Sequence, residues 1–304
     1  MVEEIKSWNE HSGEVMDSVN GYDVIDCKEC GFKHIIPLPT PEEIEAAYNH
    51  DYYTQEKPLY IERAREDLEW LNLAYDDRYD IFEKNLPKDR RRILDIGSGP
   101  GFFLLRGRQR GWETLGIEPS EQAYKHSSDL GLNIVNEFFD YELTTKLGKF
   151  DVVNMSEVLE HIVNPQEVLK LIYNLLEDNG LICISVPNDY NPFQYALRTV
   201  CDYNPWWVAP PHHINYFDFV SLKGLMTKIG FEVVLVEADF PIDMFLLMGD
   251  NYVGNEDFGK LCHEKRKNFE MNLNKAGLNS IRHRIYEALA ESNLGRRILL
   301  VARK

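Results

Sequence analysis

The sequence predicts an α/β protein with a doubly wound, mostly parallel sheet of seven strands. Short aliphatic runs alternate with helical stretches from residue 91 to about residue 237, and a glycine-rich turn follows the first run. This alternation indicates a parallel sheet with helices on both faces and ligands beyond the carboxyl ends of its strands. A chain of 304 residues, 44% of them hydrophobic, is long enough for such a domain with additions.

The pattern places the strands at residues 92–96, 113–117, 133–135, 150–155, 181–186, 231–236 and 297–302. Helices are expected at 121–129 and 165–176, and two more at 257–275 and 279–291. These elements divide the chain into an N-terminal extension (1–87), a core (88–237), a helical insert (238–295) and a last core strand (296–304). Because the insert is too long for an ordinary loop, we expect it to cap the site or to form a homodimer contact.

The N-terminal extension begins with extended segments at 22–30 and 34–37, before a helix that starts at Thr40. Pro41 suits the first helical position, and Glu43 completes a capping box with Thr40. A longer helix is expected from residue 59 to residue 85, and Pro87 ends it. Its buried stripe consists of apolar side chains at three- and four-residue steps: Leu68, Leu71, Tyr75, Tyr79 and Phe82.

The amino-acid composition narrows the range of possible binding partners. Lysine and arginine number 33 against 50 aspartates and glutamates, so the formal net charge is −17. This charge opposes a nucleic acid or an anionic membrane as the main partner. The first ten residues are polar, no apolar run is long enough to span a bilayer, and the five cysteines are scattered, so we expect a cytoplasmic protein.

The sharpest motif is the segment 94–103, Leu-Asp-Ile-Gly-Ser-Gly-Pro-Gly-Phe-Phe, where three glycines at alternate positions join a strand to a helix. Glycines there allow a sharp turn and a close approach of a ligand to the backbone. The next strand ends in Glu118, where a carboxylate is placed to accept the two hydroxyl hydrogens of an adenosine ribose. A dinucleotide-binding dehydrogenase also has a glycine-rich turn and a carboxylate at the end of the next strand. Its fingerprint is Gly-x-Gly-x-x-Gly, however, and Phe102 occupies the position of the third glycine.

The Gly-x-Gly-x-Gly loop preceded by Asp95 resembles motif I of the class I S-adenosylmethionine-dependent methyltransferases, which have a Rossmann-like fold. Segments 116–120, 150–153 and 176–181 resemble later motifs of that family, in the same order. The resemblance implies that the loop contacts the methionine moiety and the ribose, that Phe138 or Phe139 borders the adenine, and that Met155 and Ser156 face the methyl donor. The implied cofactor-binding residues are Asp95, Gly97, Ser98, Gly99, Gly101, Phe102, Glu118, Pro119, Phe138, Phe139, Met155 and Ser156.

A Glu-x-x-Glu-His cluster follows the fourth strand. If the segment is helical, Glu157, Glu160 and His161 share one face and are suited to a divalent cation that orients substrate hydroxyls. The cluster resembles the metal-binding element of ubiquinone-pathway O-methyltransferases and small-RNA 2′-O-methyltransferases. The alternative is that these side chains only cap the strand-to-helix turn.

The loop after the fifth strand contains His212 and His213, each of which is a candidate general base, with His161 as the competing base. Trp206 and Trp207 precede the loop and are candidates for the wall of a substrate pocket. The alternative is that one histidine and the tryptophans only pack.

The motif Cys27-x-x-Cys30-Gly31 resembles half of a zinc knuckle, and His11 and His34 are candidates to complete a tetrahedral site. A hairpin without metal is the alternative.

Together with Tyr48, Tyr52, Tyr53 and the histidine loop, the Cys-x-x-Cys-Gly motif resembles methyltransferases of surface-glycan and deoxysugar pathways. The resemblance implies a small-molecule or glycan-precursor acceptor, methylated at a hydroxyl. Alternatives are a sugar C-methyltransferase, a binding module that has lost catalysis, and the NAD-dependent dehydrogenase.

Overall fold

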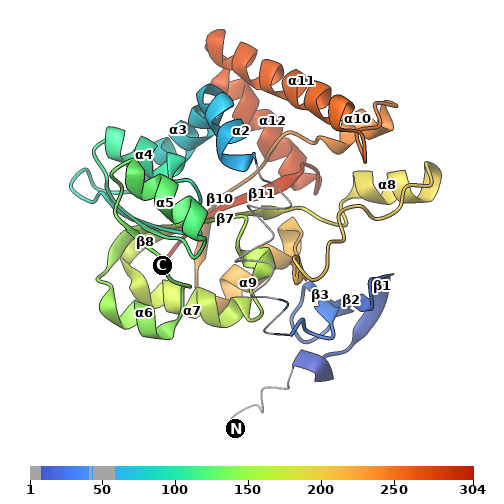
Figure 1. The fold of residues 1–304 in the computed structure, drawn as a ribbon, viewed down its shortest axis with the longest axis horizontal. Coiled ribbons are helices and arrows are strands. Elements are labelled where there is room, and N and C mark those ends of the chain that lie inside the picture. The colour runs from blue at the N-terminus through green and yellow to red at the C-terminus, as the bar shows by residue number, and fades with distance from the viewer. Residues whose placement is uncertain (1–7, 41–42, 44–58) are drawn as a thin grey trace.

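The computed structural model describes residues 8–40, 43 and 59–304 (Figure 1). Seven strands form the main sheet in the order β10-β11-β8-β7-β4-β5-β6. All its hydrogen-bonded pairs are parallel except those of β11, which runs antiparallel to β8 and to β10. The predicted doubly wound fold is therefore confirmed. The strands are β4 (Arg92–Ile96), β5 (Glu113–Ile117), β6 (Ile134–Val135), β7 (Phe150–Ser156), β8 (Leu176–Pro187), β10 (Glu232–Ala238) and β11 (Arg297–Arg303).

Helices flank both faces of this sheet, and capping residues in the sequence set their starts. Asn164 and Pro165 begin α7 (Pro165–Leu175), and Asp218 forms a capping box with Ser221 at the start of α9 (Phe219–Ile229). Gly101, in the left-handed conformation, precedes α4 (Phe102–Gln109). The remaining core helices are α5 (Glu121–Asp129), α6 (Tyr141–Lys146) and α8 (Pro192–Val200).

A second, small sheet has the order β1-β2-β3-β9. Its strands are β1 (Gly13–Val19), β2 (Tyr22–Cys27), β3 (Lys33–Ile36) and β9 (Asn215–Tyr216). The expected extended segments are present, but the sequence did not reveal β1, nor that the histidine loop supplies β9. The Thr40–Glu43 capping contacts are formed in both directions, while most of the expected helix there, with Tyr48, Tyr52 and Tyr53, lies outside the described residues.

The single helix expected over residues 59–85 is in fact two helices, α2 (Tyr60–Glu66) and α3 (Leu68–Asn85). Asp67 between them accepts hydrogen bonds from His263 at 2.7 Å and Lys267 at 2.5 Å. Both donors belong to α11 (Glu256–Lys275) in the insert, which also contains α10 (Asp243–Leu247) and α12 (Asn279–Glu291). Figure 1 shows α11 and α12 on the same side of the molecule as α2 and α3.

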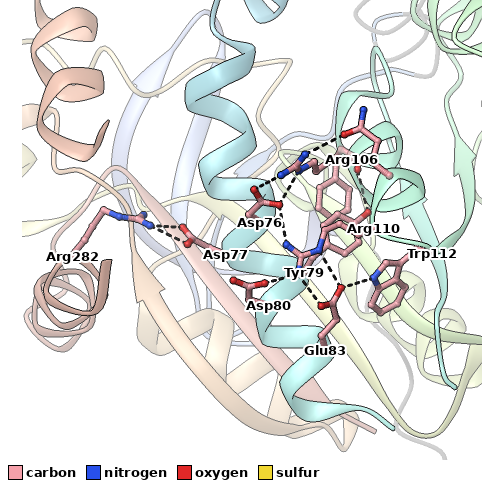
Figure 2. Close-up of polar contacts among 11 residues, drawn as sticks. Asp76, Asp77, Tyr79, Asp80, Glu83, Arg106, Arg110, Trp112 and Arg282 are labelled. Atoms are coloured by element: carbon pink, nitrogen blue, oxygen red, sulfur yellow. Dashed lines mark hydrogen bonds and ion pairs between the residues drawn. The ribbon is translucent and has the colours of Figure 1, made fainter. Parts of the chain in front are cut away.

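Ion pairs fix α3 to its neighbours (Figure 2). Asp76 accepts from Arg106 of α4 at 2.6 and 2.8 Å and from Arg110, just after α4, at 2.9 Å. On another side of α3, Arg282 of α12 donates twice to Asp77, at 2.8 and 3.0 Å. The insert is thus anchored to α3, and α3 to the core, by charge-assisted bonds.

Within the described residues, no helix combines the length and the hydrophobicity that crossing a membrane requires.

Candidate active site

A cavity of about 680 Å³ lies at the carboxyl ends of β4, β5 and β7. Its size falls in the usual range for ligand sites, roughly 300–1,000 Å³. The core contributes the glycine loop and the segments that follow β5 and β7, while α3, the insert and residues 211–214 supply the remaining walls. The cavity therefore lies where ligands bind in doubly wound folds.

The glycine loop has the conformation that its sequence requires. Gly97, Gly99 and Gly101 have positive φ angles of 70°, 52° and 80°. A Cβ atom on Gly97 would lie only 2.4 Å from Cγ2 of Val158, so this position has neither the backbone angles nor the space for a larger residue.

Glu118, directly after β5, is hydrogen-bonded to the glycine loop. Its carboxylate is 5% exposed and accepts the backbone N–H of Gly99 at 2.8 Å and that of Ser120 at 2.9 Å. Burial raises the pKa of Glu118, while these two bonds oppose the rise. Since a carboxylate has about four lone-pair sites, roughly two remain for a ligand in the cavity.

Asp95 lines the same cavity at the end of β4 and accepts a 2.7 Å hydrogen bond from Nδ2 of Asn154. Burial raises the pKa of Asp95 to about 7, although Asn154 and the nearby Arg78 lower it. Arg78, from α3, also donates to Oγ of Ser156 at 2.7 Å. Sequence reasoning missed Arg78 and Asn154, because only the packing of α3 and the pleat of β7 bring them here.

Several buried polar atoms on the cavity wall have no hydrogen-bond partner among the described residues: Oγ of Ser98, Oδ1 of Asn154 and Oε2 of Glu160. Such atoms cost free energy unless a ligand or water satisfies them. Together with the remaining lone pairs of Glu118, they fit a polar cofactor.

Two of the expected cofactor contacts, Gly101 and Met155, do not line the cavity. Ser156, Pro119, Phe102, Phe138 and Phe139 line the cavity, but Met155 is fully buried in the hydrophobic core. Side chains alternate along β7, so Asn154 and Ser156 face the cavity while Met155 faces the opposite side of the sheet.

The helical premise for the Glu-x-x-Glu-His cluster is wrong. Glu157 follows β7 with a left-handed φ of 56°, and the short 3-10 helix η3 (Leu159–His161) comes after it. In the described part of the chain, the potential metal ligands that gather here are Glu160, His161 and His213, whose ligand atoms lie within 4.8 Å of one another, without Glu157. Glu157 still lines the cavity.

Glu160 is 2% exposed, and burial, with Glu157 and Asp189 nearby, raises its pKa well above the usual value. Nδ1 of His161 donates to the backbone carbonyl of His212 at 2.7 Å, and Nε2 lies 3.8 Å from Oε1 of Glu160. The rings of His161 and His213 meet edge to face, with centroids 5.0 Å apart.

The histidine loop is fixed against η3. Asn215 donates from Nδ2 to the carbonyls of Leu159 and Ile162, at 3.1 and 2.7 Å. The N–H of Ile214 donates to the carbonyl of Glu160 at 2.8 Å. His212 and His213 line the cavity, but Trp206 and Trp207, the candidates for the wall of a substrate pocket, do not. Trp207 is instead buried in the small core beneath the second sheet.

The insert and α3 form another wall of the cavity. Glu270 of α11 accepts from Nε1 of Trp70 and from the hydroxyl of Tyr286. The guanidinium of Arg266 lies over the Trp70 ring, 4.8 Å from its centroid. All four residues line the cavity, so this wall combines flat rings with charged groups. No feature of the sequence other than the length of the insert pointed to these four residues.

Known proteins with similar sequences support this description. A family profile for a methyltransferase domain matches residues 65–236, more than half of the chain. A ubiquinone biosynthesis O-methyltransferase from Glaesserella parasuis is 32% identical over 142 residues, which cover 43% of this chain and 56% of that protein. One from a Caulobacter species is 28% identical over 162 residues, which cover 51% and 64%. The chain thus matches less than two thirds of the length of these relatives.

Two solved structures share the fold. One is a SAM-dependent methyltransferase from Archaeoglobus fulgidus, with 22% identity, a TM-score of 0.52, and coverage of 84% of this chain and 100% of that one. The other is the plantazolicin methyltransferase BamL in complex with a triazolic desmethylPZN analog and SAH, with 18% identity, a TM-score of 0.54 and coverage of 86% and 94%.

The fold is thus that of a class I methyltransferase domain. The chain belongs to the methyltransferase-domain family.

Proposed function

We propose that the chain is an S-adenosylmethionine-dependent methyltransferase that acts on a hydroxyl group of a small sugar-bearing acceptor, such as a glycan precursor. The observation that carries the proposal is the Glu160–His161–His213 cluster, which lies in the same cavity as the glycine loop and Glu118. S-adenosylmethionine supplies an activated methyl group, so the protein has to orient the acceptor and remove its proton.

For the cofactor, we propose that the glycine loop and Asp95 hold the methionine moiety and that Glu118 holds the ribose. Pro119, Phe138 and Phe139 would border the adenine, and Ser156 would face the methyl donor. The cavity lining and the two lone pairs left on Glu118 support this placement.

We propose His161 as the general base. The carbonyl of His212 fixes the proton on Nδ1, so the nitrogen that acts as the base would be Nε2, which lies 3.8 Å from Oε1 of Glu160. His212 and His213 would shape the acceptor site beside it. Oε2 of Glu160, which has no hydrogen-bond partner in the described part of the chain, would bind the acceptor directly. In the alternative, Glu160, His161 and His213 would hold a divalent cation that eases deprotonation of the acceptor hydroxyl, and His161 would then be a ligand and not the base.

The cavity wall formed by α3 and the insert supports the proposal of a sugar acceptor. Trp70 and Tyr286 offer flat apolar faces, and Arg266 and Glu270 offer hydrogen-bonding groups beside them. This mixture suits a ring that carries several hydroxyls. A second candidate acceptor is an aromatic ring with neighbouring hydroxyls, which the names of the ubiquinone-pathway relatives favour.

The test is a transfer assay with methyl-labelled S-adenosylmethionine, nucleotide sugars and sugar phosphates in one panel and catechols in another. We expect an O-methyl sugar by mass spectrometry and NMR. His161→Gln should reduce turnover by about 10²–10⁴ while cofactor affinity stays the same. Glu113→Gln, which changes an exposed residue outside the cavity, is the control. Methylation at carbon or nitrogen, or normal turnover in His161→Gln, would contradict the proposal.

Chelation distinguishes the two roles of Glu160. If a cation is needed, activity in EDTA falls and a divalent cation restores it. Full activity in EDTA would exclude a role for a cation and would leave the proposal of a general base unaffected.

We also propose that residues 238–295 act as a cap, because Arg266, Glu270 and Tyr286 line the cavity. The same insert displays exposed apolar side chains, which supports a homodimer contact: Leu247, Met248, Phe258, Leu261, Phe269, Leu278, Ile281 and Ile285. Sedimentation should then show a dimer that Ile281→Asp dissociates, and a monomeric wild type would refute this contact.

A further inference from the structure

Outside the cavity, the N-terminal extension gathers a second set of potential metal ligands. His11 follows the 3-10 helix η1 (Trp8–Glu10), Cys27 ends β2, Cys30 lies in the turn after it, and His34 lies on β3. One ligand atom from each lies within 4.8 Å of the others. None of the four lines the cavity.

The spacing of the ligand atoms matches the edges of a zinc tetrahedron. Zn–S bonds of about 2.3 Å and Zn–N bonds of about 2.05 Å give edges of about 3.3 Å for N···N and about 3.6 Å for N···S. In this chain, Nδ1 of His11 lies 3.3 Å from Nε2 of His34. The same nitrogen lies 3.4 Å from Sγ of Cys30 and 3.7 Å from Sγ of Cys27.

Hydrogen bonds around two of these side chains, His34 and Cys27, favour the protonation states that bind a metal ion. Nδ1 of His34 donates to the carbonyl of Ile35 at 3.0 Å, which fixes the tautomer and leaves Nε2 with a lone pair. This second-shell bond is the usual one for a metal-bound histidine. The backbone N–H of Cys30 points at Sγ of Cys27, 3.4 Å away, as suits a thiolate.

We propose that His11, Cys27, Cys30 and His34 bind one structural zinc ion. Two thiolates and two neutral imidazoles balance the charge of Zn²⁺ and leave no open coordination position, so the site is structural and not catalytic. Cys27 and His34 are buried, and Trp8 covers the site with its ring centroid 4.2 Å from that of His34.

The zinc supports the wall of the active site through β3. His34 pairs with Asn215 in the second sheet, and the N–H of Ile35 donates to the carbonyl of Ile214 at 2.9 Å. Asn215 in turn holds η3 through its side chain. The metal therefore fixes the strand against which residues 212–214 are placed.

The competing explanation is a hydrogen-bonded cluster of protonated thiols without metal. Oε2 of Glu29 lies 3.4 Å from Sγ of Cys27 and would accept a hydrogen bond from that thiol. In that case no metal is needed for the close approach of the four side chains.

Metal analysis of the purified full chain decides between them. We expect about one zinc per chain in wild type and its loss in Cys30→Ser and His11→Gln. Cys201→Ser, which changes an exposed cysteine, should keep the metal. Glu160→Gln should also keep it, which separates this zinc from any cation in the cavity. Replacement with Co²⁺ should give the thiolate charge-transfer bands and intense visible bands of a tetrahedral S₂N₂ site.

Wild-type protein that carries no zinc and gives no such Co²⁺ spectrum would overturn the proposal. So would zinc that remains in Cys30→Ser. Because both readouts use metal content and not activity, failure of the proposed hydroxyl acceptor leaves this test intact. Binding of S-adenosylhomocysteine to each variant shows that the core is still folded.

Discussion

Replacement of Glu118 by glutamine is the most informative change to the cofactor site. Each carboxylate oxygen accepts one backbone N–H, from Gly99 or Ser120, and has one lone pair left for a ribose hydroxyl. In Glu118→Gln one acceptor becomes an NH₂ group, which faces a buried backbone N–H and no longer accepts from the ribose.

The expected cost follows from these contacts. A hydrogen bond to a charged group contributes about 1.5–3 kcal/mol, and an unsatisfied buried donor costs about 1–3 kcal/mol. The unsatisfied donor is present with and without the cofactor and lowers the stability of the fold, so the lost bond to the ribose alone weakens cofactor binding, by about 10- to 10²-fold.

Isothermal titration with S-adenosylhomocysteine measures this loss. Glu113→Gln is the matched control, because Glu113 lies on the same strand, 73% exposed, with one ion pair to Arg92. We expect near-normal affinity in the control and a folded protein in both variants. An affinity of Glu118→Gln within about threefold of wild type, or ~0.7 kcal/mol, would refute the reasoning.

Three further predictions concern the loop and two titrating groups. Gly97→Ala should lower the melting temperature and cofactor affinity, at a cost of ~1–3 kcal/mol beyond Gly111→Ala, which has a similar positive φ but no atom within 4 Å of its Cβ. The folded-state pKa of Asp95 is about 7, so the native state holds a proton that the unfolded state releases near pH 4. The free energy of unfolding should therefore fall as pH rises from about 4 to about 7, and denaturant titrations of Asp95→Asn should lose that part of the slope. Hydrogen bonds to Asp77 and Glu237 raise the pKa of His283 to about 10. Its contribution, ~2 kcal/mol after screening, should be complete below about pH 6.5 and lost as pH rises through about 10, and His283→Gln should abolish this loss.

The sequence predicted the main sheet well, because each strand is an aliphatic run bounded by turn residues. β4 and β5 have the expected bounds, and so do α5 and α12. The conformation of the glycine loop could be predicted equally well, since it depends on local backbone geometry. Glu118 was readable for the same reason, because it ends a strand at a fixed distance from the loop.

Features that depend on contacts between distant segments could not be predicted from the sequence. Glu157 was expected on a helix because Glu-x-x-Glu-His has helical spacing, yet the chain leaves β7 through a left-handed residue. His213 joins Glu160 and His161 only because Asn215 bonds to η3. The break at Asp67 likewise coincides with its bonds to α11, almost 200 residues away.

A crystal structure of the enzyme with S-adenosylhomocysteine tests the central claim most directly. The account predicts the ribose hydroxyls on Glu118, the methionine moiety along the glycine loop, and the sulfur directed toward Ser156 and His161. A cofactor whose ribose lies away from Glu118, or whose sulfur faces away from the Glu160–His161–His213 cluster, would contradict it.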